Sequence, residues 1–351
     1  MDNGIANLKN AQEQLKIYRQ AVLKKAFEGE LTRKWREEQT DLPSAEELLL
    51  QIKEEREKQY QKQLDEWKKA VKEWEDNGKD GKKPSRPKKP KELPPLSEEA
   101  LKELPELPVG WCWERLGLIA NKIQIGPFGS QLHKCDYRKE GVPIINPKHI
   151  RGQNLNPKER ISKGKADSLS QYYLQENDII LGRRGEMGRS APITSKTNGW
   201  FCGTGSLYIR LGQHFKSKLY SLILSEKRVV DYLENQSRGT TMTNLNLQIL
   251  HSLPIQLIPI AEQSKIVREI ETRLSVCDKL EATIAESMQK AEALRQSILK
   301  RAFEGELLNE TELEEARNAP DWEPADKLLE RIKVEKEKQG TKKSFWGTPS
   351  E

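Results

Sequence analysis

The sequence has few residues of the kinds that build metal centres, disulfide frameworks and membrane spans. Its 351 residues include only four cysteines and four histidines, and none stands in the paired spacing of metal ligands. No apolar run approaches the roughly 20 residues that a membrane-spanning helix needs. The first residues, Met1–Ile5, lack the basic and apolar segments of a signal peptide. These absences predict a cytoplasmic protein in a reducing compartment, without structural zinc and without a membrane partner.

Recognisable catalytic constellations are also missing. The sequence has no Asn-Pro-Pro-aromatic tetrapeptide of amino-methylating enzymes, no Gly-x-Ser-x-Gly nucleophile turn and no His-Glu-x-x-His metal site. The glycines at 126 and 129, and those at 182, 185 and 188, lie outside the strand-glycine-helix context of a nucleotide-binding loop. The sequence therefore predicts a protein without enzymatic activity and without a cofactor of its own.

Charge, in contrast, is abundant and unevenly distributed. Charged residues make up 32% of the chain and hydrophobic residues 35%, a balance typical of long solvated helices around a smaller core. The net charge is +6, but residues 105–259 hold 21 Lys or Arg against 12 Asp or Glu, so this segment carries +9 and the remainder −3. A basic centre between near-neutral arms is typical of a polyanion-binding head on a scaffold. Charge alone leaves open a scaffold that binds partners and no nucleic acid.

One segment occurs twice, near opposite ends of the chain. Residues 19–31 read RQAVLKKAFEGEL and residues 295–307 read RQSILKRAFEGEL, so ten of thirteen positions are identical. A second matching pattern follows each copy, at residues 48–52 and 328–332. The separation of 276 residues is too long for a solenoid and predicts two matching modules around a central domain. Each copy is expected to be a docking element or a helix cap with a buried phenylalanine, Phe27 or Phe303.

Heptad spacing predicts long helices at both ends. Apolar residues alternate at steps of three and four over residues 5–27, and they recur every seven residues over 260–303, a length of about 65 Å. Gly29 is expected to end the first helix, and Ser44 to cap a second helix over 45–74. If the heptad helices pair within one chain, roughly 20 residues of seam stay uncovered, and a second copy or a partner helix is expected there. The expected seam residues are Leu8, Leu15, Val22, Ile270, Cys277, Leu280, Ile284, Ala291, Leu294 and Ile298.

The central part of the chain has a different composition. Residues 78–91 contain seven basic residues, one acidic residue and three prolines, which predicts an extended linker that is also able to contact phosphates. From Pro105, β-branched and aromatic runs are cut by Gly, Pro and Asn, which predicts a mixed, mainly β domain. Strands are expected at 142–145, 178–181 and 206–211, and one helix over 218–234. Trp111, Trp113 and Phe128 are expected in the core of this domain.

These patterns together predict an α+β chain, a mixed and mainly β domain flanked by long coiled-coil helices. The expected regions are 1–77, a truncated helical region; 78–104, the basic linker with a short helix; 105–259, the central domain; 260–339, the second helical region; and 340–351, a tail.

A series of short motifs runs along the chain in a fixed order. The motifs are Leu107-Pro-x-Gly-Trp111-x-Trp113, Gly126-Pro-Phe-Gly-Ser130, Asp178-Ile-Ile-Leu-x-Arg183-x-Gly185-x-x-Gly188, Thr243-Asn-Leu-Asn246, Leu253-Pro-Ile, Ala261-Glu-Gln263-x-x-Ile266 and the repeated Leu299–Leu307. In this order they resemble the specificity (S) subunits of Type I restriction-modification systems. Such subunits have two target-recognition domains between helical regions; each domain reads one half of a split DNA sequence, and the helices dock methylating subunits.

The resemblance implies a DNA-recognition subunit whose partners carry out the chemistry. It implies double-stranded DNA, methylating (M) subunits that bring S-adenosylmethionine, and a restriction (R) subunit where the system has a nuclease. This chain departs from the pattern, because it has one recognition domain where full-length members have two. It is therefore expected to be a half-subunit that forms a homodimer or pairs with another half. An alternative is a half-subunit that sequesters methylating subunits without specifying DNA.

Under this resemblance, loops of the central domain carry the side chains that approach base edges. Arginine suits guanine, and Asn or Gln suits adenine. Two identical heads on a rigid coiled coil would read an interrupted palindrome. The alternative for each candidate is an ordinary surface loop residue. The candidates are Ser130, Gln131, His133, Lys134, Lys148, His149, Arg151, Arg183, Arg184, Arg238, Thr240, Thr241 and Asn244.

Overall fold

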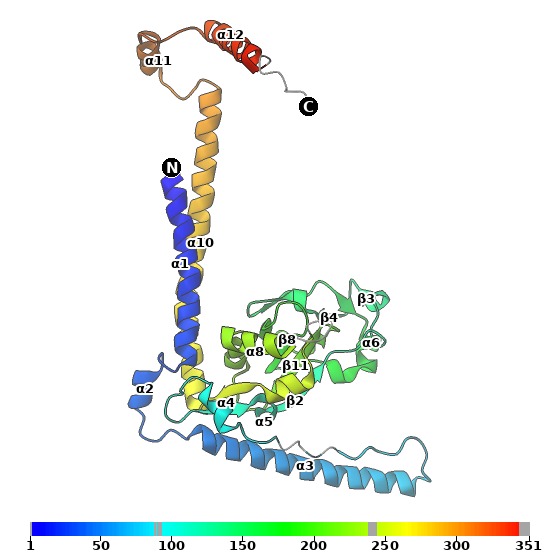
Figure 1. Ribbon diagram of the computed structural model, residues 1–351. Helices are drawn as coiled ribbons and strands as arrows, with labels where there is room; N and C mark the ends of the chain where they lie inside the picture. Colours follow the sequence, from blue (N-terminus) through cyan, green and yellow to red (C-terminus); the bar gives the residue numbers. More distant parts are fainter. Residues whose placement is uncertain (1, 88, 90–92, 238–243, 344–351) are drawn as a thin grey trace, which may run out of the picture. The chain divides into compact units, whose positions relative to one another are not determined.

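The computed structural model describes residues 2–87, 89, 93–237 and 244–343 (Figure 1). Contacts divide the chain into two units, residues 14–279 and residues 1–13 with 280–351. All the strands of the described residues lie in the larger unit. The chain is α+β, as the sequence predicts. None of the helices in the described ranges has the length and apolarity that a bilayer crossing requires.

Long helices form where the heptad patterns predict them. Gly29 ends the first helix with a φ of 71°, and the Glu30 amide donates to the Lys25 carbonyl at 2.9 Å. The Ser44 hydroxyl caps the second helix by accepting from the Glu47 amide at 3.2 Å. The α-helices are α1 Asp2–Phe27, α2 Arg33–Glu37, α3 Ala45–Asp76, α4 Glu98–Lys102, α5 Leu116–Ile119, α6 Lys163–Ser168, α7 Ser217–Leu224, α8 Lys227–Ser237, α9 Leu247–Ser252, α10 Ile260–Phe303, α11 Glu310–Arg317 and α12 Ala325–Lys343, with 3-10 turns η1 Lys134–Asp136, η2 Pro147–His149 and η3 Ser170–Tyr172.

The single helix expected over 218–234 is wrong, because α7 and α8 are separate helices. The break lies at Ser225, whose hydroxyl donates to the carbonyls of Gly188, at 2.8 Å, and Ser221, at 3.1 Å. A serine hydroxyl that bonds the carbonyl four residues earlier, here that of Ser221, competes with regular helix continuation. Gly188 also packs closely there, since a Cβ on it would lie 2.3 Å from Cγ2 of Val230.

The strands form two four-stranded sheets and two antiparallel pairs, the short hairpin β5-β6 and the long-range pair β1-β12. The main sheet has the order β2-β11-β8-β9 and is antiparallel throughout. The second sheet has the order β10-β4-β7-β3, with a parallel β10-β4 pair. The strands are β1 Cys112–Arg115, β2 Ala120–Ile125, β3 Tyr137–Arg138, β4 Val142–Ile145, β5 Ile150–Arg151, β6 Asn154–Leu155, β7 Arg160–Ile161, β8 Asp178–Gly182, β9 Ser190–Pro192, β10 Phe201–Cys202, β11 Ser206–Leu211 and β12 Pro254–Leu257.

Both faces of the main sheet are covered. Alternate residues of β8 point to opposite faces, so Ile179 joins one hydrophobic cluster and Ile180 the other. The first cluster includes residues of α7, α8, α9 and the start of α10, and the second includes the smaller sheet through Ile144 and Phe201. Because β8 is buried on both sides, its sequence is continuously apolar after Asp178.

Two of the sequence motifs and the segment after the first repeat meet at one buried carboxylate. Glu262, in the first turn of α10, has no exposed surface. It accepts hydrogen bonds from the Thr32 hydroxyl at 2.6 Å, from Nε of Arg36 at 3.0 Å and from the Trp111 indole at 2.7 Å. The turn after α1 and the beginning of the central domain are therefore tied to α10 through one side chain.

The next residue, Gln263, joins α10 to the central domain. Its side chain accepts from the Lys216 amide at 2.9 Å and donates to the carbonyls of His214, at 3.1 Å, and Ile258, at 2.9 Å. The antiparallel pair β1-β12, with Cys112 opposite Leu257, brings the two ends of the central segment together beside this joint.

Part of the basic linker lies along α3. The indoles of Trp67 and Trp74 donate to the carbonyls of Pro84, at 3.0 Å, and Gly81, at 3.2 Å. Arg86 lies 5.8 Å from the ring centroid of Trp67. These two tryptophans of α3 thus pack against the linker.

The two copies of the repeat form the same turn in different surroundings. Gly305 has a φ of 75°, and the Glu306 amide donates to the Arg301 carbonyl at 2.8 Å, which matches the bond at Gly29. Phe27 is 2% exposed, whereas Phe303 is 90% exposed. The helix-cap expectation is confirmed for both copies, and the buried phenylalanine only for the first.

The expected seam residues differ in exposure along α10. In the larger unit Val22, Ile270 and Cys277 are buried, Leu15 is half-buried, and Arg19 of α1 pairs with Asp278 of α10 at 2.5 Å. In the smaller unit Leu8, Ile284 and Ala291 are half-buried, whereas Leu280, Leu294 and Ile298 are exposed.

Candidate functional site

Several loops leave the main sheet at the same edge. Leu207 of β11 pairs with Ile125 of β2, and Ser206 pairs with Gly182 of β8. The loops after β2 and β8 and the turn before β11 therefore begin side by side. The parallel pairing of Cys202 in β10 with Ile145 in β4 brings the turn after β4 to this edge as well. We call this edge the loop edge.

Close backbone contacts hold these loops against one another. The Gly126 amide donates to the Ser206 carbonyl at 2.9 Å, and the Gly203 amide donates to the Ile145 carbonyl at 2.8 Å. A Cβ on Gly126 would lie 2.0 Å from the Gly203 carbonyl oxygen, and a Cβ on Gly203 would lie 2.2 Å from Oδ1 of Asn146. Both positions require glycine, so the loop edge is a packed backbone scaffold.

Arg183, Arg184 and Asn244 meet at the loop edge, although they are about 60 residues apart. The Arg183 amide donates to the Gly205 carbonyl at 2.9 Å, and its Nε donates to the Leu245 carbonyl at 2.8 Å. Nε of Arg184 donates to Oδ1 of Asn244 at 2.8 Å. Burial, and then the charge of Arg184, lower the pKa of Arg183. Arg183 is thus partly buried and connects the end of β8 to Leu245, and Arg184 is exposed beside Asn244.

Lys148, His149 and Arg151 follow β4, and the structure separates their positions. Lys148 is exposed and forms an ion pair with Glu159, and Arg151 is exposed in the β5-β6 pair. His149 is only 3% exposed, and its Nε2 lies 2.6 Å from Oε2 of Glu159. Burial, opposed by the charge of Glu159, lowers the pKa of His149. His149 therefore supports this segment from inside.

The loop after β2 carries the next group of candidates. Ser130, His133 and Lys134 are exposed, whereas Gln131 is half-buried. Oε1 of Gln131 accepts from the Phe128 amide at 3.3 Å and from the Tyr172 hydroxyl at 3.0 Å. Gln131 thus holds the turn, and the other three face solvent.

The remaining candidates, Arg238, Thr240 and Thr241, lie outside the described residues.

The expectation that Phe128 lies in the core is wrong. Its side chain is 61% exposed, whereas Trp111 is buried and Trp113 is half-buried. The sequence shows that the residue is apolar, which favours burial. It does not show which side of a tight turn the side chain faces. The neighbouring Pro127 and Leu132, both buried, take the inner side instead.

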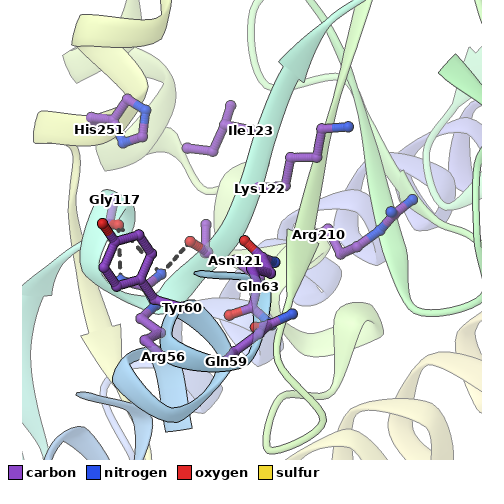
Figure 2. A pocket seen from close by; sticks show the side chains of 11 residues that line it. Arg56, Gln59, Tyr60, Gln63, Gly117, Asn121, Lys122, Ile123, Arg210 and His251 are labelled. Carbon is purple, nitrogen blue, oxygen red and sulfur yellow. Dashed lines mark hydrogen bonds between the residues drawn. The ribbon is translucent and has the colours of Figure 1, made fainter. Parts of the chain in front are cut away.

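A cavity of about 710 Å³ lies between α3 and β2, away from the loop edge. Its lining includes Arg210, which pairs in register with Lys122 and Asp178 at the other end of the sheet. Figure 2 shows Lys122 on the side of β2 opposite Ile123. Arg56 of α3 also lines this cavity.

The arginines of this cavity have internal partners. Arg56 donates to the carbonyls of Gly117 and Ala120, and burial lowers its pKa. Arg210 pairs with Asp178 through two bonds of 2.7 Å. Burial, and then the charge of Arg210, lower the pKa of Lys122. We interpret this cavity as part of the contact between α3 and the central domain, because its arginines already donate hydrogen bonds to protein oxygens.

Comparison with known proteins identifies the family. Residues 110–290, just over half of the 351 residues, match the family model described as Type I restriction modification DNA specificity domain. The chain is 24% identical to the Type I restriction enzyme EcoDI specificity subunit of Escherichia coli, over 97% of this chain and 64% of that protein. It is 30% identical to the StySPI specificity subunit of Salmonella potsdam, over 66% of this chain and 47% of that protein.

A crystal structure of the HsdS subunit from Thermoanaerobacter tengcongensis is also similar. It matches 75% of this chain and 57% of that chain with 20% sequence identity and a TM-score of 0.42. The chain spans about half to two thirds of the length of the two curated relatives described here. Specificity subunits are non-catalytic components of restriction-modification complexes. With its matched domain, the chain belongs to the Type I restriction-modification DNA specificity family.

Proposed function

We propose that this chain is a DNA-recognition subunit of a Type I restriction-modification system, and that residues 105–259 are a target-recognition domain that reads one half of a bipartite site. The observation that carries the proposal is the loop edge, where separate loops present exposed polar and basic side chains together. Side chains at one edge can reach neighbouring base pairs, while cations around them neutralise phosphates. The relatives' names, specificity subunits of Type I restriction enzymes, support it.

The partners follow from the same proposal. The helical regions 1–77 and 260–339 would dock methylating subunits, which supply S-adenosylmethionine and methylate adenine, and a restriction subunit would join the same complex. Residues 78–104 would connect the first helical region to the recognition domain, and residues 340–351 would form a tail. The fully hydrogen-bonded joint at Glu262 supports a fixed attachment of a recognition domain to a helical frame.

A bipartite site needs a second recognition domain from elsewhere. We propose that a second copy of this chain, or another specificity chain, supplies it by pairing along α10. Leu294 is 55% exposed and Ile298 is 37% exposed, which leaves apolar seam positions available in the smaller unit. Two identical recognition domains would read an interrupted palindrome.

The test is co-expression with the methylating subunit encoded beside this chain, in a host without other such systems, followed by mapping of methylated adenines by long-read sequencing. An interrupted palindrome supports the homodimer, and a split asymmetric motif that needs a second specificity gene supports pairing of different chains. A stable complex without new methylation contradicts DNA specification and favours sequestration of methylating subunits.

Two variants localise the readout. Arg184→Ala removes an exposed cation from the loop edge and is expected to change or abolish the motif. Lys196→Ala removes an exposed cation from the loop between β9 and β10 and is expected to leave the motif intact. Loss of the motif in both variants would indicate a general charge effect.

A further inference from the structure

We infer that Phe128 is a wedge that presses its ring into one base step of the half-site, an inference that rests on the proposed DNA recognition. Phe128 is 61% exposed, and its neighbours Gly129 and Ser130 are exposed as well. The ring therefore stands at the tip of the loop that follows β2, on the loop edge that carries Arg184 and Lys148.

The turn that carries the ring is fixed by hydrogen bonds. The Phe128 carbonyl accepts from the amides of Gln131, at 2.8 Å, and Leu132, at 3.2 Å. The Phe128 amide donates to Oε1 of Gln131, and the Tyr172 hydroxyl donates to the same oxygen. Leu132 is 4% exposed and anchors the turn in the second hydrophobic cluster. The backbone of the loop tip is thus already ordered.

An exposed aromatic ring on an ordered turn is suited to binding. A phenylalanine has only two side-chain torsions, so little conformational entropy is lost when its ring is fixed. Single exposed apolar residues are common on protein surfaces and need no function. Here, however, the Phe128 amide and carbonyl and the Gln131 side chain bond within the protein, and the exposed ring stands on a loop that leaves the same edge of the sheet as the loops of Arg184 and Lys148.

Base steps are the apolar surface that such a site would meet on DNA. Apolar side chains inserted at a base step partly unstack it and kink the duplex. Pyrimidine–purine steps deform most easily, so a wedge distinguishes sequences through their stiffness without a hydrogen bond to any base. Phe128 would therefore favour a flexible step within the half-site, next to base pairs read by polar side chains.

The first test uses the complex of the full chain with its methylating subunit and a duplex carrying the site found by methylation mapping. Phe128→Ala is expected to weaken binding roughly 10- to 100-fold, as loss of one base-stacking contact does. Because no charge is removed, the slope of log affinity against log salt should stay unchanged. Phe128→Trp should retain most of the affinity.

Leu101→Ala is the matched control, since Leu101 of α4 is an exposed apolar side chain (40%) away from the loop edge. It should leave DNA affinity unchanged. Circular dichroism and thermal melting of each variant complex should match those of the wild-type complex, because the exposed ring is not part of the core.

A mismatch scan separates a wedge from a general contact. A mismatch at the step that receives the ring is already cheap to open. A mismatch at that one step, and at no other position, should therefore remove most of the difference in DNA affinity between wild type and Phe128→Ala. Equal binding of wild type and Phe128→Ala to the matched duplex, or a loss that is the same at every mismatch position, would overturn the wedge. A wild-type complex that binds no specific duplex would instead overturn the proposed function.

Discussion

Arg36 and Glu262 form an ion pair of 3.0 Å in which the Glu262 side chain is completely buried. The guanidinium also donates to the Gly29 carbonyl at 2.6 Å and lies 5.7 Å from the ring centroid of Trp111. The pair therefore links the turn after α1, the start of α10 and the start of the central domain. A buried carboxylate is tolerated here because its oxygens have several donors.

Glu262→Ala should destabilise the chain by about 3–5 kcal/mol, because it leaves the partly buried Arg36 guanidinium, the buried Thr32 hydroxyl and the Trp111 indole without their carboxylate acceptor. Denaturant unfolding of the purified full chain measures the free energy of unfolding. Glu286→Ala is the control: Glu286 pairs with Lys290 on the surface of α10, and its loss should cost at most about 0.5 kcal/mol. Equal effects of the two substitutions would contradict the structural role of the joint.

The two repeats should respond differently to the same substitution. Phe27→Ala creates a cavity in the hydrophobic core and should cost about 3–5 kcal/mol of unfolding free energy. Phe303→Ala removes a ring that is 90% exposed and should change stability by at most about 0.5 kcal/mol. Unfolding of the isolated full chain compares them directly. A large loss from Phe303→Ala would mean that the second repeat is packed in the free chain.

Periodic patterns predicted the long helices α1, α3 and α10 well, and also a strand that is buried on both faces, β8. Both signals are local, since a heptad or an apolar run reports burial whatever the partner is. The loop edge was predicted only in part. Arg184 and Asn244 were singled out separately, but their contact depends on strand register. The outward position of Phe128 depends on which neighbours fill the core first, and local patterns do not carry that information.

The sequence also did not predict the role of Glu262. The motif Ala261-Glu-Gln263 indicated a family. It did not indicate that the Glu262 carboxylate has partners 226 to 230 residues earlier in the chain. Such long-range pairing leaves no periodic trace in a single sequence. The break at Ser225 has a similar origin, because the Ser225 hydroxyl also donates to the carbonyl of Gly188, which belongs to a distant turn.

Arg184 and Lys148 should differ in how they contribute to DNA binding. Arg184→Ala should cost about 1–3 kcal/mol and relax preference at one base pair, if its guanidinium reads a base edge beside Asn244. Lys148→Ala should weaken binding to all duplexes alike and reduce the salt slope by about one, as for a phosphate contact. Titrations of cognate and scrambled duplexes over a salt series distinguish the two. Identical losses on both duplexes for Arg184→Ala would exclude direct readout by that residue.

His149 should make the stability of the chain depend on pH. Burial lowers its pKa in the folded chain below the value of about 6.5 that an unfolded histidine has. As pH falls through about 6.5, the unfolded state takes up a proton before the folded state does, so this contribution to stability is lost on acidification. The melting temperature should fall between pH 7 and pH 5, and His149→Gln should show a weaker decrease. The exposed His133, replaced by Gln, serves as the matched control and should keep the wild-type dependence. The same dependence in His149→Gln and wild type would show that other groups, and not the buried imidazole beside Glu159, set the acid limit.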